Sequence, residues 1–174
     1  TSLRLMLRQS KAMIDLAKDQ PRKSAVGLSH FSRNGVKTGY ALHWELDGEW
    51  PAHLLLQEVQ DGFRSAEAVR RDENGDRPPA SLPGRLPYKL REFGPLLEAL
   101  LSDETLETND KNQLMDGFFR QALKGDIDNR LADSAFRVWS QGLSLARKQG
   151  WPLERAVDGL LLARRLASGG EEDG

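Results

Sequence analysis

Apolar and polar positions divide the chain into a helix, a strand-rich segment and a long helical half. Residues 2–20 carry apolar side chains at the spacing of one helix face, and Pro21 follows them. Ser2 is a suitable N-cap for this helix. The pattern therefore predicts one amphipathic helix at the start of the chain. Its apolar face consists of Leu3, Met6, Leu7, Met13, Ile14 and Ala17.

A strand pattern follows this helix. Between residues 36 and 46, larger side chains such as Tyr40 and Leu42 alternate with small or polar ones, which is typical of a strand with one buried face. Asn34-Gly35 and Asp47-Gly48 are hairpin signals, because glycine takes a positive φ angle at little cost. The pattern predicts three antiparallel strands over residues 24–59.

The registers of the two hairpins are less well defined than the strands. For the second hairpin, a three-residue loop over residues 46–48 pairs Glu45 with Glu49 and sets Trp44 opposite Trp50. This register gathers the large apolar groups on one face, so we prefer it to a two-residue turn at Asp47-Gly48.

Two registers stay open for the first hairpin. A two-residue turn at Asn34-Gly35 would bury Phe31. A three-residue bulged loop would instead bury Val26 and Leu28, and the alternation does not choose between them.

The second half of the chain reads as helices separated by breakers. A short helix over residues 63–71 precedes a loop over residues 72–87, which is rich in proline and glycine. Phe118, Phe119, Phe136, Trp139 and Trp151 are expected to build the helical core. Four helices are predicted after the loop: residues 88–102 with a restart at Gly94-Pro95, residues 110–124, residues 129–149 with Asp126 or Asp128 as cap, and residues 152–167 opened by Pro152.

The predicted fold class is α+β. An N-terminal helix and a three-stranded antiparallel β-meander are followed by a mostly helical C-terminal region of about four helices. The boundaries are residues 1–71 for the helix and meander, 72–87 for the loop, 88–168 for the helical region and 169–174 for an acidic tail. With 174 residues and 39% hydrophobic content, the two halves can also form one compact domain.

Composition and missing motifs narrow the function classes. The chain has no cysteine, which excludes thiol catalysis, iron–sulfur clusters and the common zinc fingers. It has no phosphate loop, no dinucleotide-binding fingerprint and no G-x-S-x-G motif. No apolar run approaches the roughly 20 residues of a membrane span, and the first residues lack the apolar stretch of a signal peptide. We therefore expect a cytoplasmic protein that is not an enzyme, needs no cofactor and has no membrane partner.

Three histidines offer the main argument for an enzyme. His30, His43 and His53 all fall in the predicted sheet, and the preferred register makes His43 and His53 diagonal neighbours near Glu45 and Glu49. Two histidines with a carboxylate suit metal binding or acid–base chemistry. An ordinary polar sheet face explains the same pattern better, so no metal site is predicted. A His/carboxylate-dependent enzyme is kept as the second alternative function.

Charge is segregated along the chain although the net charge is −1. Residues 1–40 carry eight Lys/Arg and two Asp/Glu, and residues 136–168 carry six and two. Residues 41–76 have the opposite balance, with three and nine. The two basic segments predict that two helix faces converge into an anion-binding surface.

The cationic helix faces point to a nucleic-acid backbone. On the helix over residues 129–149, a polar stripe without acids follows helical spacing: Arg130, Ser134, Arg137, Gln141, Ser144 and Lys148. Lys and Arg displace counterions from phosphodiesters, and hydroxyls and amides donate to phosphate oxygens. We therefore expect a non-enzymatic accessory subunit of a larger nucleoprotein assembly that contacts RNA or single-stranded DNA without base readout. The predicted contact residues are Arg4, Arg8, Lys11, Lys18, Arg22, Lys23, Arg130, Arg137 and Lys148.

A protein-only role is the first alternative. Leu160, Leu161 and Leu162 are consecutive, so they cannot all point the same way on a helix. We predict that they form a partner-binding surface, although burial on most sides of the helix is the other explanation. In this alternative the protein is an adaptor, inhibitor or chaperone that docks through its C-terminal helices, and the cationic faces meet an acidic protein.

Overall fold

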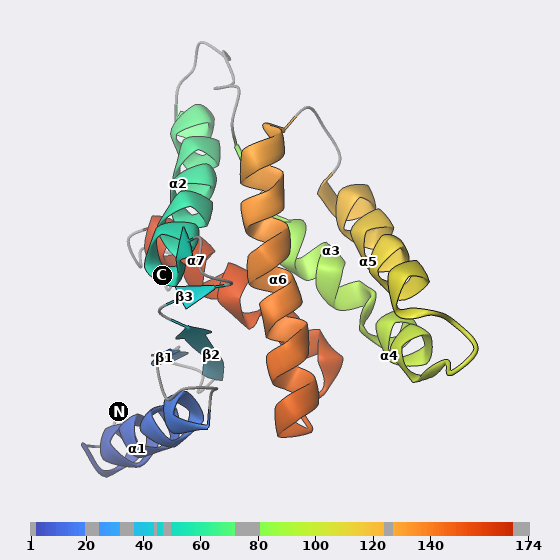
Figure 1. Ribbon diagram of the computed structural model, residues 1–174. Helices are drawn as coiled ribbons and strands as arrows, with labels where there is room; N and C mark the ends of the chain where they lie inside the picture. Colours follow the sequence, from blue (N-terminus) through green and yellow to red (C-terminus); the bar gives the residue numbers. More distant parts are fainter. Residues whose placement is uncertain are drawn as a thin grey trace.

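The computed structural model describes residues 3–19, 25–31, 37–43, 45–46, 50–71, 81–123 and 127–168. Over these residues the protein has an α+β fold that is mostly helical, with a two-stranded antiparallel sheet instead of the predicted three strands. Helix α6 (Asn129–Gln149) runs through the middle of the molecule, between α2 (Ala52–Arg71) and α5 (Thr108–Leu123) (Figure 1).

The remaining elements surround this helical layer. The sheet lies between α1 and the other helices (Figure 1). The N-terminal elements are α1 (Leu3–Lys18), β1 (Ala25–Phe31), β2 (Lys37–His43), β3 (Glu45–Leu46) and β4 (Trp50–Pro51). The C-terminal elements besides α5 and α6 are α3 (Leu86–Glu92), α4 (Gly94–Ser102), the 3₁₀ helix η2 (Leu153–Val157) and α7 (Asp158–Ala167).

The segment predicted as the third strand is the first half of α2. Leu55, Leu56, Val59 and Phe63 are buried, and their spacing follows one face of a helix rather than a period of two. Leu54, next to them, is largely exposed. The prediction of a third strand within residues 24–59 is therefore wrong, and the short helix expected over residues 63–71 is the second half of α2.

The observed registers settle one hairpin and correct the other. β1 pairs with β2 so that Leu28 lies opposite the buried Tyr40. This is the register predicted for a three-residue bulged loop, in which Val26 and Leu28 lie on the core side. β3 and β4 pair Leu46 with Trp50. The predicted pairing of Trp44 with Trp50 is wrong, because α2 begins directly after β4 and leaves no strand to extend the ladder.

Local chemistry sets the ends of the C-terminal helices. α3 and α4 meet at the predicted restart before Pro95. α6 has its predicted bounds: the Asp128 carboxylate accepts hydrogen bonds from the backbone N–H groups of Arg130 (2.9 Å) and Leu131 (3.2 Å). Gly150 ends the helix with a φ of 63°. After Pro152 the chain first forms η2, so α7 starts later than predicted.

One hydrophobic core joins elements from both halves of the chain. Its aromatic side chains confirm the prediction that the aromatic residues of the helical half build the core. The Phe119 ring centroid lies 5.3 Å from that of Phe136 and 5.7 Å from that of Trp139. Phe118 and Trp151 are partly buried and pack against the same core.

Tyr40 attaches the sheet to α6. Its side chain is 1% exposed. The hydroxyl lies 3.1 Å from the carbonyl oxygen of Val138 and 2.8 Å from Oε1 of Gln141, and these two acceptors share its one proton. Burial raises the pKa of this hydroxyl, so it stays protonated as a donor.

Replacing Tyr40 with phenylalanine is expected to lower the free energy of unfolding by about 1 to 2 kcal/mol, because buried acceptors lose their donor while the ring still fills its space. Urea denaturation followed by circular dichroism measures this loss. A change below about 0.5 kcal/mol, as is typical of surface substitutions, would contradict the role of the hydroxyl in holding β2 on α6.

Candidate nucleic-acid interface

From residue 134 onward, the exposed side of α6 carries cations and hydroxyls without acids, since no Asp or Glu occurs from residue 134 to residue 153. The exposed Asp133 lies just before this stretch, four residues from Arg137, and can offset that charge as an i, i+4 pair. Arg147 and Lys148 have no carboxylate at such a spacing. We call this surface the α6 basic face. It consists of the exposed Arg137, Ser144, Arg147 and Lys148 and the half-buried Ser140.

Part of the predicted stripe contacts other elements of the protein, although the Arg130 side chain stays 68% exposed. Ser134 is buried, and its hydroxyl donates to Oε2 of Glu58 over 2.8 Å. Arg130 Nε lies 2.8 Å from Oε1 of the same carboxylate. Gln141 accepts from the hydroxyl of Tyr40. These polar residues fasten α6 to α2 and β2, so we remove Arg130 from the candidate interface.

Sequence reasoning missed two members of the face. Ser140 and Arg147 lie three and ten residues after Arg137, which places them on the same side of a helix. Their helical spacing from Arg137 could have identified them in the sequence. It was overlooked because the neighbouring row with Ser134 and Gln141 is free of acids, whereas the row with Ser140 and Arg147 also contains Asp133. Only the position of α2 shows which of the two rows is exposed.

α1 contributes a second set of cations. Arg8, Lys11 and Lys18 are exposed, and so are Asp15 and Asp19, which reduce the net positive charge of the helix. Arg22, Lys23 and the side chain of Arg4 lie outside the described residues, so the structure adds nothing to their prediction.

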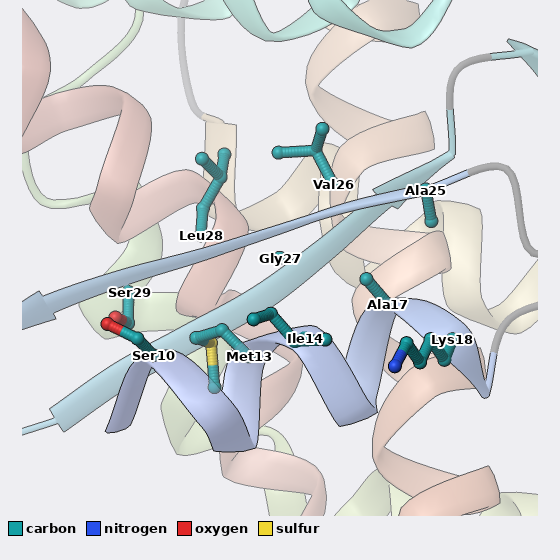
Figure 2. A pocket seen from close by; sticks show the side chains of 10 residues that line it. All are labelled: Ser10, Met13, Ile14, Ala17, Lys18, Ala25, Val26, Gly27, Leu28 and Ser29. Atoms are coloured by element: carbon teal, nitrogen blue, oxygen red, sulfur yellow. The ribbon is translucent and has the colours of Figure 1, made fainter. Parts of the chain in front are cut away.

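α1 packs closely along β1. A β-carbon at Gly27 would lie 2.4 Å from the carbonyl oxygen of Met13, so only glycine allows this approach. A pocket of about 660 Å³ lies between the two elements, with Val26 and Leu28 pointing away from α1 (Figure 2). Lys18 lines this pocket, which places one cation of α1 beside the sheet.

The C-terminal ends of α1 and α6 meet. The Lys148 ammonium group donates a hydrogen bond to the backbone carbonyl oxygen of Asp19, directly after α1. Lys18 is in the last turn of α1, and Arg147 and Lys148 are in the last turn of α6. Cations are stabilised at helix C-termini, where unpaired carbonyl groups concentrate negative partial charge. The contact joins the α6 basic face to the end of α1, where Lys18 lies beside the exposed Asp15 and Asp19. That the two helix faces form an anion-binding surface stays a prediction.

The histidines do not form the arrangement considered from the sequence. His43 is in β2 and His53 is in α2, so they are not neighbours across two strands. The His30 ring makes a hydrogen bond through Nδ1 with the Arg165 guanidinium. Over the part of the chain that the structure describes, no three His, Asp or Glu residues form a group that could hold a metal ion.

The three consecutive leucines lie in the core. Leu160, Leu161 and Leu162 are 0%, 5% and 5% exposed. α7 contacts α2, α3, α6 and β2, so it is covered on most sides. This placement replaces the partner surface predicted for these residues, because a partner cannot reach them without unpacking α7.

Searches against known proteins give no relative for comparison. No family model, curated protein or solved structure matches the chain. Among the described helices, none is both long and apolar enough to cross a membrane. The geometry of the α6 basic face is therefore the main guide to function.

Proposed function

We propose that the protein is a non-enzymatic accessory subunit that binds the phosphodiester backbone of RNA or single-stranded DNA through the α6 basic face and the end of α1. One observation supports this most directly. After the exposed Asp133, the exposed side of α6 carries Arg137, Arg147 and Lys148 without a further acid and is joined by Lys148 to the C-terminal end of α1.

The dimensions of the face suit an extended polyanion. Arg137 and Lys148 are eleven residues apart on one helix, which corresponds to about 16 Å along its axis. In a stacked strand this distance covers roughly five nucleotides at about 3.4 Å each. The serine hydroxyls between the cations supply donors for phosphate oxygens. Such a face binds the backbone and makes no contacts that depend on the base sequence.

The charge of the whole protein limits this binding. The net charge of −1 provides little long-range attraction for a polyanion. Binding then depends on local contacts of a few cations, which favours a subunit that works beside other nucleic-acid-binding chains. We therefore expect moderate affinity for the isolated protein and tighter binding in its assembly.

Replacing Arg137, Arg147 and Lys148 with glutamine is expected to weaken binding to a short fluorescein-labelled RNA about tenfold or more at low salt, because each cation releases counterions from a phosphate. Fluorescence anisotropy measures the affinity. The matched control replaces three exposed arginines of other elements, Arg64, Arg85 and Arg120, and should leave the affinity within about twofold.

Other outcomes favour a different class of partner. Equal losses in both triple variants would mean that binding follows total charge and not the α6 basic face. A wild-type protein that binds neither RNA nor single-stranded DNA at low salt, alone or in its native complex, would contradict the proposal. Capture of an acidic protein by the same face would then support the adaptor alternative.

A further inference from the structure

A groove with one apolar and one cationic side lies against the α6 basic face. Its volume is about 480 Å³, within the range of small-ligand sites. Leu101 at the end of α4, Met115 of α5 and Leu143 of α6 form the apolar side. We call it the α4–α6 groove.

The other side of the groove consists of residues from the α6 basic face. Ser140 and Ser144 provide hydroxyls, and Arg147 and Lys148 provide positive charge. Lys148 donates to a backbone carbonyl and not to a carboxylate in its contact with Asp19, so this bond orients the ammonium without cancelling its charge. An anionic group is therefore stabilised at this side of the groove.

A third cation lies at the α4 edge. Lys111 donates to the carbonyl oxygen of Leu101 over 3.4 Å. Hydrogen bonds from Thr105, followed by the charge of Lys111, hold the pKa of Asp103 below its usual range. Lys111 is thus already shared with the Asp103 carboxylate. Arg147 and Lys148 line the groove and Lys111 does not, so we place the anion site at Arg147, on the opposite side.

We propose that the α4–α6 groove holds one nucleotide of a single strand, with its base against Leu101, Met115 and Leu143 and its phosphate at Arg147 and Ser144. This inference rests on the proposed function and narrows its substrate. A base in a duplex is stacked and paired and cannot enter a groove of this kind, whereas an unpaired base can turn out of its strand. The polarizable Met115 thioether suits contact with a flat base. The protein then prefers single strands to duplexes.

The methionines provide a local test in the intact protein. The chain has three, of which Met6 and Met13 are in α1 and Met115 lines the groove. In protein labelled with ¹³C at the methionine methyl groups, a short single-stranded RNA is expected to shift the Met115 signal. The duplex of the same sequence should leave it in place. The α1 signals should respond to both nucleic acids alike.

Narrowing the groove provides the second readout. Replacing the exposed Ser144 with leucine keeps every cation and is expected to reduce affinity for the single strand about fivefold. The duplex loses only one hydroxyl donor, so its affinity should fall by less than about twofold. The same replacement at Gln113, an exposed residue of α5 outside the groove, is the matched control and should change neither affinity.

The outcomes separate this inference from the proposed function. If RNA binds and the Arg137, Arg147 and Lys148 triple variant weakens it, but the Met115 signal and the S144L affinity do not change, the inference fails and the proposed function stands. If no RNA binds, both fail. A Met115 shift caused by an acidic peptide and not by RNA would assign the groove to a protein segment and overturn the inference.

Discussion

Replacing Gly142 with alanine is expected to destabilise the protein by about 2 to 3 kcal/mol, although alanine is the better helix former. At Gly142 the backbone of α6 lies directly against that of η2. A β-carbon there would lie 2.1 Å from the carbonyl oxygen of Ala156 and 2.9 Å from its carbonyl carbon. These neighbours are backbone atoms, so they cannot rotate away, and the two helices would have to separate.

The same substitution on α5 provides the control. A β-carbon at Gly117 would meet no atom within 4 Å. Gly117→Ala should therefore stabilise the protein by up to about 1 kcal/mol through helix propensity alone. Urea denaturation of both variants gives the comparison. If Gly142→Ala stabilises the protein as much as Gly117→Ala does, the close packing of α6 on η2 is contradicted.

Replacing Asp158 with alanine is expected to cost about 3 kcal/mol, the lower end of the range for breaking a buried ion pair. The carboxylate is 4% exposed. Its Oδ2 atom accepts hydrogen bonds of 3.2 Å from the backbone N–H of Gly39 and from Nε and Nη2 of Arg155. Arg155 also lies over the Trp151 ring, 3.7 Å from its centroid. Removal of the carboxylate leaves the Gly39 N–H and the guanidinium without this acceptor.

Asparagine at the same position tests the role of charge. Asp158→Asn should cost only about 1 to 1.5 kcal/mol at neutral pH, because an amide oxygen still accepts hydrogen bonds. Burial raises the pKa of Asp158, although hydrogen bonds from Gly39 and the charge of Arg155 oppose the shift. The folded state therefore holds the proton more tightly than the unfolded state does.

The pH dependence follows from this shift. The contribution of Asp158 to stability falls as pH rises from the unfolded carboxyl value of about 3.9 through the raised folded value. The difference in unfolding free energy between wild type and Asp158→Asn should accordingly shrink over that window. Equal costs for the alanine and asparagine variants at neutral pH would contradict a hydrogen-bonding role for the carboxylate.

The helices could be predicted where local chemistry fixes their ends. Asp128 caps α6 and Gly150 ends it, and both signals lie within a few residues of the boundary. The restart before Pro95 is of the same kind. At Pro152 the cue marked the start of helical structure but not its type, because the 3₁₀ helix η2 follows the proline directly and α7 begins only at Asp158.

The third strand was mispredicted because its cues were local and ambiguous. Asp47-Gly48 is a hairpin signal, and the run from Leu54 to Leu56 fits a buried strand as well as a helix. The helical spacing of Leu55, Val59 and Phe63 favoured a helix. This signal was missed because the prediction assigned Phe63 to a separate short helix and the other two residues to the sheet. The burial of Leu55, Leu56, Val59 and Phe63 on one side shows that the segment is a helix.

The candidate site was predictable only as a distribution of charge. Two neighbouring polar rows on α6 were visible in the sequence, one free of acids and the other with Asp133 as its one acid. Ser134 faces Glu58, which is 76 residues away along the chain, so its burial depends on tertiary packing. The meeting of Lys148 with the end of α1 likewise joins segments 129 residues apart. Neither contact has a local sequence signal.

The salt dependence of binding tests the central proposal most directly. For wild-type protein and a short single-stranded RNA, the logarithm of the association constant should fall with the logarithm of salt concentration with a slope of about −2 or steeper, because Arg137, Arg147 and Lys148 each release roughly 0.7 of a counterion from a single strand. Absent binding at low salt, or an affinity that salt leaves unchanged, would contradict a backbone-binding face on α6.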